Sequence, residues 1–258
     1  MKKRITVIVI LILVIAFVTG CGAKNTKSIE TGNITKENVS YVCETLKDAG
    51  LSNVDVFEKW VNDMASSESS NESDVSGFSD ADCRMTVMLL AGDLIKYDSL
   101  EEEYAGDYLM FDVDAIMNNE EFSILKDKKT LFTTLFGETD ITENGFAQAL
   151  SDKWAKYGLA VDSDKCSIIS IAFKTYEDEK AFVGHTGILI DCKDSELVDS
   201  NYVFVEKIAF GEPFVITLLK DEEELIDVFS ARADYTVEEG DPLPVVYKND
   251  KILGELKN

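Results

Sequence analysis

The stretch AFVGHTGILID at residues 181–191 decides the fold, because its run of β-branched and aromatic side chains is typical of a buried strand. Three stretches of similar composition, residues 167–174, 202–209 and 214–219, lie on either side of it and are separated by charged turns. Strands that follow one another in this way favour an antiparallel meander.

Helical spacing of apolar residues marks much of the remaining chain. Residues 36–49 and a second segment after Ser52 each carry one apolar stripe, which predicts two N-terminal helices. A third helix begins at Cys83, with Asp80 or Asp82 as its cap. The other predicted elements are a short strand at 108–111, a helix from a Thr142 cap to Tyr157, a helix at 222–231 and a hairpin that turns at Asn249 and Asp250. Together these elements predict the α+β class.

Cys83 and His185 form the candidate catalytic pair. The first turn of a helix lowers the pKa of a thiol through the positive end of the helix dipole, and a neighbouring imidazole strengthens that effect. His185 lies on a predicted strand whose Gly187 leaves room for another element to approach. We therefore expect the Cys83 helix to pack across this sheet, with Cys83 as nucleophile and its backbone N–H as one oxyanion donor.

Glu206 is the candidate third member. If the hairpin turn centres on residues 194–197, His185 faces Glu206 and Gly187 faces Phe204 across the two strands. A slip of two residues in the strand pairing would keep the same alternation of apolar side chains. A carboxylate beside the imidazole holds the useful tautomer and stabilises the protonated ring.

These motifs resemble the papain-like NlpC-type cysteine peptidases and amidases that cut peptidoglycan stem peptides. The order of Cys83, then His185, then a polar residue on the next strand matches that family. Arg84 stands where the family usually has a small residue, and Glu206 replaces its usual His, Asn or Gln. The resemblance implies a papain-like fold, with a helix packed on an antiparallel sheet and added N-terminal helices, and acyl transfer on an amide.

A resemblance over nearly the whole chain after the signal segment is to the Firmicutes lipoproteins of domain-of-unknown-function family forty-three hundred. It rests on the runs Asp82–Thr86, Ser167–Phe173, Gly184–Leu189 and Phe204–Pro213. This resemblance implies a lipoprotein and leaves the reaction open.

The N-terminal sequence predicts a targeting signal. Residues 1–20 combine a basic start with a short apolar run, and the segment 18–21, Val-Thr-Gly-Cys, fits a bacterial lipoprotein signal, which makes Cys21 the lipidated N-terminus, carrying acyl chains such as palmitate. An uncleaved anchor helix is the alternative. Residues 21–34 are then a polar tether and residues 35–258 one α+β domain, held outside the cytoplasm on the cell membrane.

Charge and cysteine content exclude several functions. The net charge of −24 becomes −27 when the three basic residues at positions 2–4 are removed, so nucleic acid is not an expected partner. With one histidine and no CxxC motif, we expect neither a metal nor another cofactor. Asp112 and Asp114 are a weak candidate cation pair. Four cysteines beyond Cys21 allow one or two disulfides, and nothing in the sequence calls for an oligomer, so we expect a monomeric domain.

The sequence favours the hypothesis of a membrane-anchored cysteine hydrolase that acts on a cell-wall peptide or a small amide. Its rival is a non-catalytic lipoprotein that binds a ligand or a protein. In that interpretation Cys83 packs in the core, His185 is structural, and Glu206 forms a surface pair with Lys207.

The anchor has a direct test. Cys21→Ala removes the sulfur that carries the lipid, so we expect loss of lipid labelling and either release of the protein or an unprocessed precursor. Mass spectrometry of the protein from its native host is the measurement. An unmodified Cys21 still joined to residues 1–20 would contradict the lipoprotein interpretation.

Overall fold

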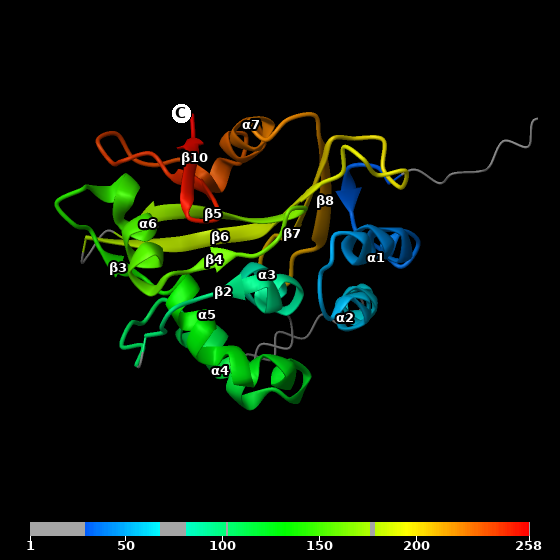
Figure 1. Ribbon diagram of the computed structural model, residues 1–258, viewed down its shortest axis with the longest axis horizontal. Helices are drawn as coiled ribbons and strands as arrows, with labels where there is room; N and C mark the ends of the chain where they lie inside the picture. Colours follow the sequence, from blue (N-terminus) through cyan, green and yellow to red (C-terminus); the bar gives the residue numbers. More distant parts are fainter. Residues whose placement is uncertain (1–28, 68–80, 102, 176–178, 258) are drawn as a thin grey trace, which may run out of the picture.

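The computed structural model describes residues 29–67, 81–101, 103–175 and 179–257, and it is an antiparallel sheet with helices against both faces (Figure 1). The signal segment, Cys21, most of the tether and the acidic stretch 68–80 lie outside the described residues. Among the described residues, no helix is long and apolar enough to cross a membrane. The α+β class is confirmed.

The main sheet contains the predicted meander. Its order is β1-β8-β7-β6-β5-β9-β10, with β3 paired to β6. The strands are β1 (Gly32–Asn33), β3 (Thr139–Asp140), β5 (Cys166–Lys174), β6 (Lys180–Asp191), β7 (Tyr202–Lys207), β8 (Phe214–Leu219), β9 (Val245–Lys248) and β10 (Lys251–Glu255). A separate pair, β2 (Ile95–Lys96) and β4 (Ala160–Val161), forms a small second sheet. The predicted C-terminal hairpin is therefore confirmed as β9 and β10.

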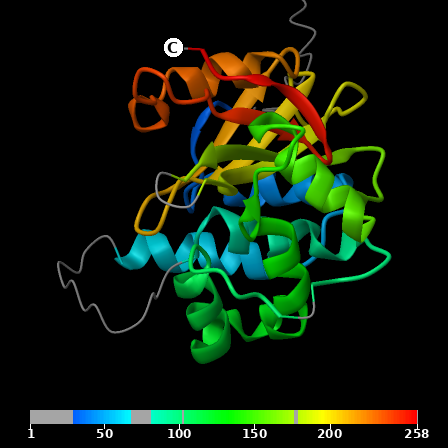
Figure 2. The ribbon, with the colours of Figure 1, turned by 90° about the vertical axis from the view of Figure 1, so that its left-hand side faces the viewer.

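Helices cover the two faces unequally. The α-helices of the described residues are α1 (Val39–Asp48), α2 (Val54–Ser67), α3 (Cys83–Ala91), α4 (Met110–Asn118), α5 (Lys129–Phe136), α6 (Phe146–Tyr157) and α7 (Glu224–Ser230), with 3-10 turns η1 (Gly92–Leu94), η2 (Glu120–Lys128) and η3 (Ala233–Tyr235). Figures 1 and 2 show α7 on one side of the sheet and α3, α4 and α5 on the other.

Two predicted elements are wrong. In place of the expected strand at residues 108–111, a turn at residues 108–109 leads into α4, which begins at Met110, because the buried residues Leu109, Asp112 and Ile116 recur at helical spacing. The expected cap Thr142 lies before the start of α6 at Phe146. The Thr142 hydroxyl instead accepts a hydrogen bond from the backbone N–H of Asn144 and stabilises the preceding turn.

The sheet separates two hydrophobic clusters. Ile188, Val203 and Val205 face the α3 side, whereas Leu189 and Phe204 face α7. Both tryptophans of the chain, Trp60 and Trp154, are buried on the α3 side. Residues alternate between faces along each strand, so neighbours in sequence belong to different clusters.

A β-bulge interrupts this alternation inside β6. Ile171 pairs with His185 and Ala172 pairs with Val183, so Gly184 is the extra residue. The bulge places Val183 in the α3-side cluster and leaves His185 on the α7 side, beside the Phe229 ring of α7. A Cβ atom at Gly184 would lie 2.5 Å from the Phe173 ring, so the missing side chain is what lets that ring cover the bulge.

Gly187 gives a test of this packing. A Cβ atom there would lie 2.4 Å from the Phe204 ring and 2.9 Å from the backbone oxygen of Val205, so Gly187→Ala should destabilise the fold by about 1–3 kcal/mol. Urea unfolding measures the change. Gly254→Ala is the matched control, since its nearest contact would be 3.3 Å from the flexible end of Ile226. Equal stabilities of the two variants would contradict the packing argument.

Candidate active site

The first turn of α3 fills a gap beside β6. On the side of β6 away from β5, β7 pairs with residues 187–191 and β3 pairs with residues 180 and 181, and no strand among the described residues pairs with the stretch between them. Arg84 Nη1 donates to the backbone oxygen of Val183 at 3.0 Å. The backbone N–H of Thr186 lies close enough to the Cys83 thiol to act on its pKa. The Arg84 side chain of α3 therefore bonds a backbone group that a neighbouring strand would otherwise bond.

Two buried aspartates hold this turn in place. Asp82 caps α3 by accepting a hydrogen bond from the backbone N–H of Met85 at 2.7 Å, which confirms it as the cap. Arg84 donates two hydrogen bonds to Asp112, at 2.9 and 3.2 Å, and lies 3.2 Å from the second oxygen of Asp82. Burial, followed by the nearby charge of Asp112, raises the pKa of Asp82 well above its usual value. The arginine therefore joins α3, α4 and β6.

Asp112 is therefore an ion-pair partner of Arg84, which supplies the positive charge that a bound cation would bring. Asp114, its partner in the weak cation hypothesis, instead accepts a hydrogen bond from Asn118 at 2.6 Å. In the part of the chain that the structure describes, no group of three or more His, Cys, Asp or Glu side chains could hold a metal ion.

Cys83 is buried and carries a neutral thiol. Burial, and then the charge of Asp82, raise its pKa to about 12, so the expected lowering by the helix N-terminus is wrong in this closed structure. Unlike Cys43, which packs in the α3-side core, Cys83 lies outside both hydrophobic clusters. The four described cysteines, 43, 83, 166 and 192, are all free thiols, so none of the disulfides allowed by their number is present among them.

His185 and Glu206 are in direct contact, although in a different register from the expected one. Glu206 pairs across the strands with Gly187, two residues from His185, yet its Oε2 lies 2.5 Å from the ring Nε2 of His185. Both side chains face α7, because a two-residue slip preserves the face of a strand. The expected surface pair of Glu206 with Lys207 is also wrong, since both side chains are fully buried.

Arg232 completes the charge balance at Glu206. It donates to both carboxylate oxygens, at 3.0 and 2.5 Å. Burial raises the pKa of Glu206, but the hydrogen bonds from His185 and Arg232 outweigh it and leave the pKa below its usual value. Glu206 is therefore a carboxylate at neutral pH.

Tyr235 covers the cluster on the α7 side. Its ring lies 6.0 Å from that of His185, its hydroxyl accepts a hydrogen bond from Arg232 at 3.2 Å, and its phenol lies within electrostatic reach of the Cys83 sulfur. The sequence offered no signal for Arg232 or Tyr235, because both follow α7 without a motif.

The candidate residues thus gather at one point of the fold from both sides of the sheet. His185, Glu206, Arg232 and Tyr235 form one contact cluster on the α7 side. Cys83 reaches the neighbouring residue, Thr186, through the gap in the sheet. The pairing of Cys83 with His185 as a catalytic dyad stays a prediction.

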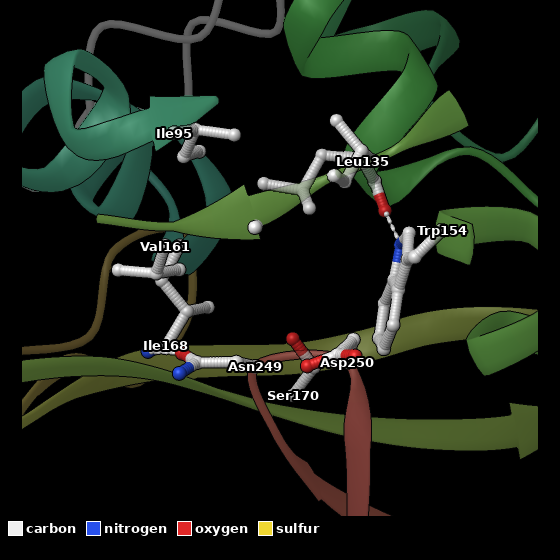
Figure 3. A pocket seen from close by; sticks show the side chains of 10 residues that line it. Ile95, Leu135, Trp154, Val161, Ile168, Ser170, Asn249 and Asp250 are labelled. Carbon is white, nitrogen blue, oxygen red and sulfur yellow. Dashed lines mark hydrogen bonds between the residues drawn. The ribbon is translucent and has the colours of Figure 1, made fainter. Parts of the chain in front are cut away.

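A small apolar pocket lies elsewhere, between the β2–β4 pair and the main sheet (Figure 3). The Trp154 indole N–H, at its wall, donates to the backbone oxygen of Leu135 at 2.9 Å. Its cavity of about 20 Å³ has room for about one water molecule. None of Cys83, His185 and Glu206 lines it, so we interpret it as a packing gap.

Comparison with known proteins gives a family. The model of the family described as Domain of unknown function (DUF4300) matches residues 32–253, and the chain belongs to that family. No curated protein and no solved structure matches the chain significantly. The family assignment therefore agrees with the resemblance found in the sequence and carries no activity with it.

Asp82 gives a test of the site's electrostatics. The folded-state pKa of Asp82 is raised above its unfolded-state value of about 3.9. The protonated side chain therefore adds its full contribution to the free energy of unfolding below about pH 3.9. That contribution is lost as the pH rises through the folded-state pKa. Asp82→Asn keeps a capping oxygen and removes the titration. We expect its unfolding free energy to fall less steeply with rising pH than that of the parent, by up to about 1.4 kcal/mol per pH unit.

The measurement is urea unfolding at a series of pH values. Asp82→Ala is the control, because it also removes the cap and should lower stability by about 1 kcal/mol relative to Asp82→Asn at every pH. Parallel pH profiles for the parent and Asp82→Asn would show that Asp82 does not titrate in this range.

Proposed function

We propose that this protein is an extracytoplasmic, lipid-anchored cysteine hydrolase with a papain-like arrangement of its site. Cys83 is the nucleophile, His185 the general base and acid, and Glu206 the residue that orients the imidazole. The observation that carries the proposal is the 2.5 Å contact of His185 with an ionised Glu206, one residue from Thr186, whose backbone N–H lies close enough to the Cys83 thiol to act on its pKa.

The imidazole is held in the tautomer that this chemistry needs. Glu206 and Arg232 form a buried ion pair, so Glu206 is an acceptor and the His185 Nε2 carries the hydrogen that bonds it. That leaves Nδ1 as the free ring nitrogen that accepts a proton from a thiol. A carboxylate in this role also stabilises the imidazolium that forms during the reaction.

The reaction then follows the order of acyl transfer. The Cys83 thiol gives its proton to Nδ1 while the sulfur bonds the carbonyl carbon of an amide. The imidazolium next gives that proton to the leaving amine, and a thioester remains on Cys83. Water, deprotonated by His185, attacks the thioester and releases the acid and the thiol. The backbone N–H of Cys83, at the start of α3, is one candidate donor to the oxyanion.

Burial sets the resting state of this site. With a pKa of about 12, Cys83 rests as a neutral thiol rather than as half of an ion pair. Its proton therefore leaves during the attack on the carbonyl, and His185 acts as a general base. Proton transfer in a buried site favours a substrate that enters and displaces some of the side chains around Cys83 and His185, since water is largely excluded from the closed site.

An amide of a cell-wall peptide, or a similar small amide, is the proposed substrate. A lipid on Cys21 would hold the protein at the outer face of the cell membrane, within reach of wall peptides, and the net charge of −24 disfavours contact with anionic polymers. We propose a monomer that needs no metal or other cofactor and has no nucleic-acid partner.

A binding protein without turnover is the second candidate. The observation that favours it is burial, because Cys83, His185 and Glu206 are 5%, 2% and 1% exposed and Arg232 satisfies both oxygens of Glu206. In that case the cluster stabilises the α7 side of the sheet, and ligands bind to another surface.

Acylation separates the two candidates. We expect p-nitrophenyl acetate to acylate Cys83, Cys83→Ala and His185→Ala to abolish that adduct, and Glu206→Gln to slow it by about 10- to 100-fold. Mass spectrometry of the trapped adduct and the release of p-nitrophenol are the measurements. Cys166→Ala and Ser151→Ala are the controls, since these buried residues lie outside the site, and both should keep the parent rate. Acylation that does not depend on His185 would favour the binding protein.

A further inference from the structure

A second cavity, open to solvent, lies beside Tyr235. Its volume is about 330 Å³, which is in the range of sites that bind small molecules. One wall is aromatic and comes from Tyr108 and from the paired strand residues Phe173 and Phe182. The opposite wall comes from the segment after α7 and contains Asp234 and Asp241. We name this cavity the aromatic–acidic cleft.

One side chain separates the aromatic–acidic cleft from the candidate site. The Phe173 ring, in the cleft wall, lies 5.4 Å from the Tyr235 ring, and the Tyr235 ring lies 6.0 Å from the His185 ring. Asp234 and Thr236, the neighbours of Tyr235 in sequence, both line the cleft. Tyr235 therefore stands between the cleft and the His185 ring.

Tyr235 is a partly exposed cover whose ring contacts Phe173, His185 and Phe229. It belongs to η3, a turn of three residues. Its hydroxyl accepts a hydrogen bond from Arg232, which remains bonded to Glu206 through other contacts. Rotation of the tyrosine side chain would break that bond without disturbing the His185–Glu206 pair.

The residues that line the cleft favour a ligand that carries a positive charge next to an apolar group. Tyr108 stacks on Phe182 with ring centroids 4.7 Å apart, so the wall presents aromatic surface to a ligand. Among the described residues of the lining, Lys174 is the one basic residue, and it pairs with Glu179 at 3.1 Å rather than with Asp234 or Asp241. Aromatic faces together with carboxylates attract ammonium groups through cation–π and charge interactions.

We propose that the aromatic–acidic cleft is the substrate subsite of the Cys83 site, that it takes an amine-bearing group with an apolar stem, and that Tyr235 moves to connect it to Cys83. The inference rests on the proposed function, because it assigns to the cleft the substrate of that reaction. It adds the chemical class of the substrate: an amide whose acyl or leaving group carries a free ammonium.

Modification of Cys83 by methanethiosulfonates of different charge tests the charge preference without any turnover. In this reaction the Cys83 sulfur bonds the reagent's thiol sulfur and methanesulfinate leaves. We expect the cationic 2-aminoethyl reagent to react faster with Cys83 than the anionic 2-sulfonatoethyl reagent, after each rate is divided by the rate with free cysteine. The double variant Asp234→Asn and Asp241→Asn should lower this ratio by about 3- to 10-fold. The measurement is the rate of modification of the Cys83 peptide by mass spectrometry.

Asp199→Asn is the matched control, because Asp199 lines a different cavity, and it should leave the ratio unchanged. A ratio that stays at the parent value in the double variant would overturn the assignment of the cleft.

The same reagents test the cover. Tyr235→Ala should raise the rate of Cys83 modification by both reagents by about 10-fold or more, since it removes the side chain between the cleft and the site. Tyr235→Phe, which loses only the hydrogen bond from Arg232, guards against misfolding and should give a smaller increase. Circular dichroism checks the fold of each variant. Unchanged rates in both variants would show that Cys83 is not reached past Tyr235.

The methanethiosulfonate experiments can succeed or fail independently of the acylation test of the proposed function. A cleft-dependent charge ratio together with no acylation by p-nitrophenyl acetate would refute the hydrolase and keep the cleft as a route to Cys83. Acylation of Cys83 with no dependence of the charge ratio on Asp234 and Asp241 would keep the hydrolase and refute the subsite.

Discussion

The arrangement of the candidate site depends on one buried cation, the guanidinium of Arg84. It lies between the carboxylates of Asp82 and Asp112 and also donates to the backbone oxygen of Val183. These contacts fix the start of α3, the start of α4 and the unpaired edge of β6 relative to one another. Removing Arg84 would leave the buried carboxyl groups of Asp82 and Asp112 without a positive partner, and breaking a buried pair in this way commonly destabilises a protein by about 3–5 kcal/mol. The position of Cys83 between Asp82 and Arg84 follows from this network.

The same network that positions Cys83 also suppresses its acidity. Asp82 and Asp112 add negative charge near the sulfur, and burial adds a larger effect in the same direction. On the other side of the sheet the balance is reversed, because Arg232 and His185 keep Glu206 ionised despite its burial. The site therefore combines a thiol that holds its proton with a carboxylate that has lost one. Such an opposition of two environments is typical of groups that exchange protons only when a substrate is present.

The sequence predicted those features that depend on local pattern. The four long strands and the Asp82 cap were accessible because β-branched runs and capping residues act within a few positions. The contact of His185 with Glu206 survived a register error of two residues, since such an error preserves the face of the strand. Arg232, Tyr235 and the high pKa of Cys83 were not accessible, because each depends on contacts across the fold. The strand prediction at residues 108–111 was wrong for the same reason. The apolar run belongs to a helical stripe whose second member, Asp112, is a buried carboxylate paired with Arg84 from another helix.

The bulge at Gly184 has a consequence for how this strand can change. Gly184 divides β6 into two segments whose side chains alternate in opposite phase. Odd-numbered residues before it and even-numbered residues after it point to the same face of the sheet. Deleting Gly184 would remove the bulge and leave every other residue of β6 on its present face, whereas deleting any regularly paired residue would turn one end of the strand inside out. Substitutions can exchange side chains along β6, but insertions and deletions are confined to its ends and to the bulge. The length of such a strand is therefore constrained as strongly as the residue types along it.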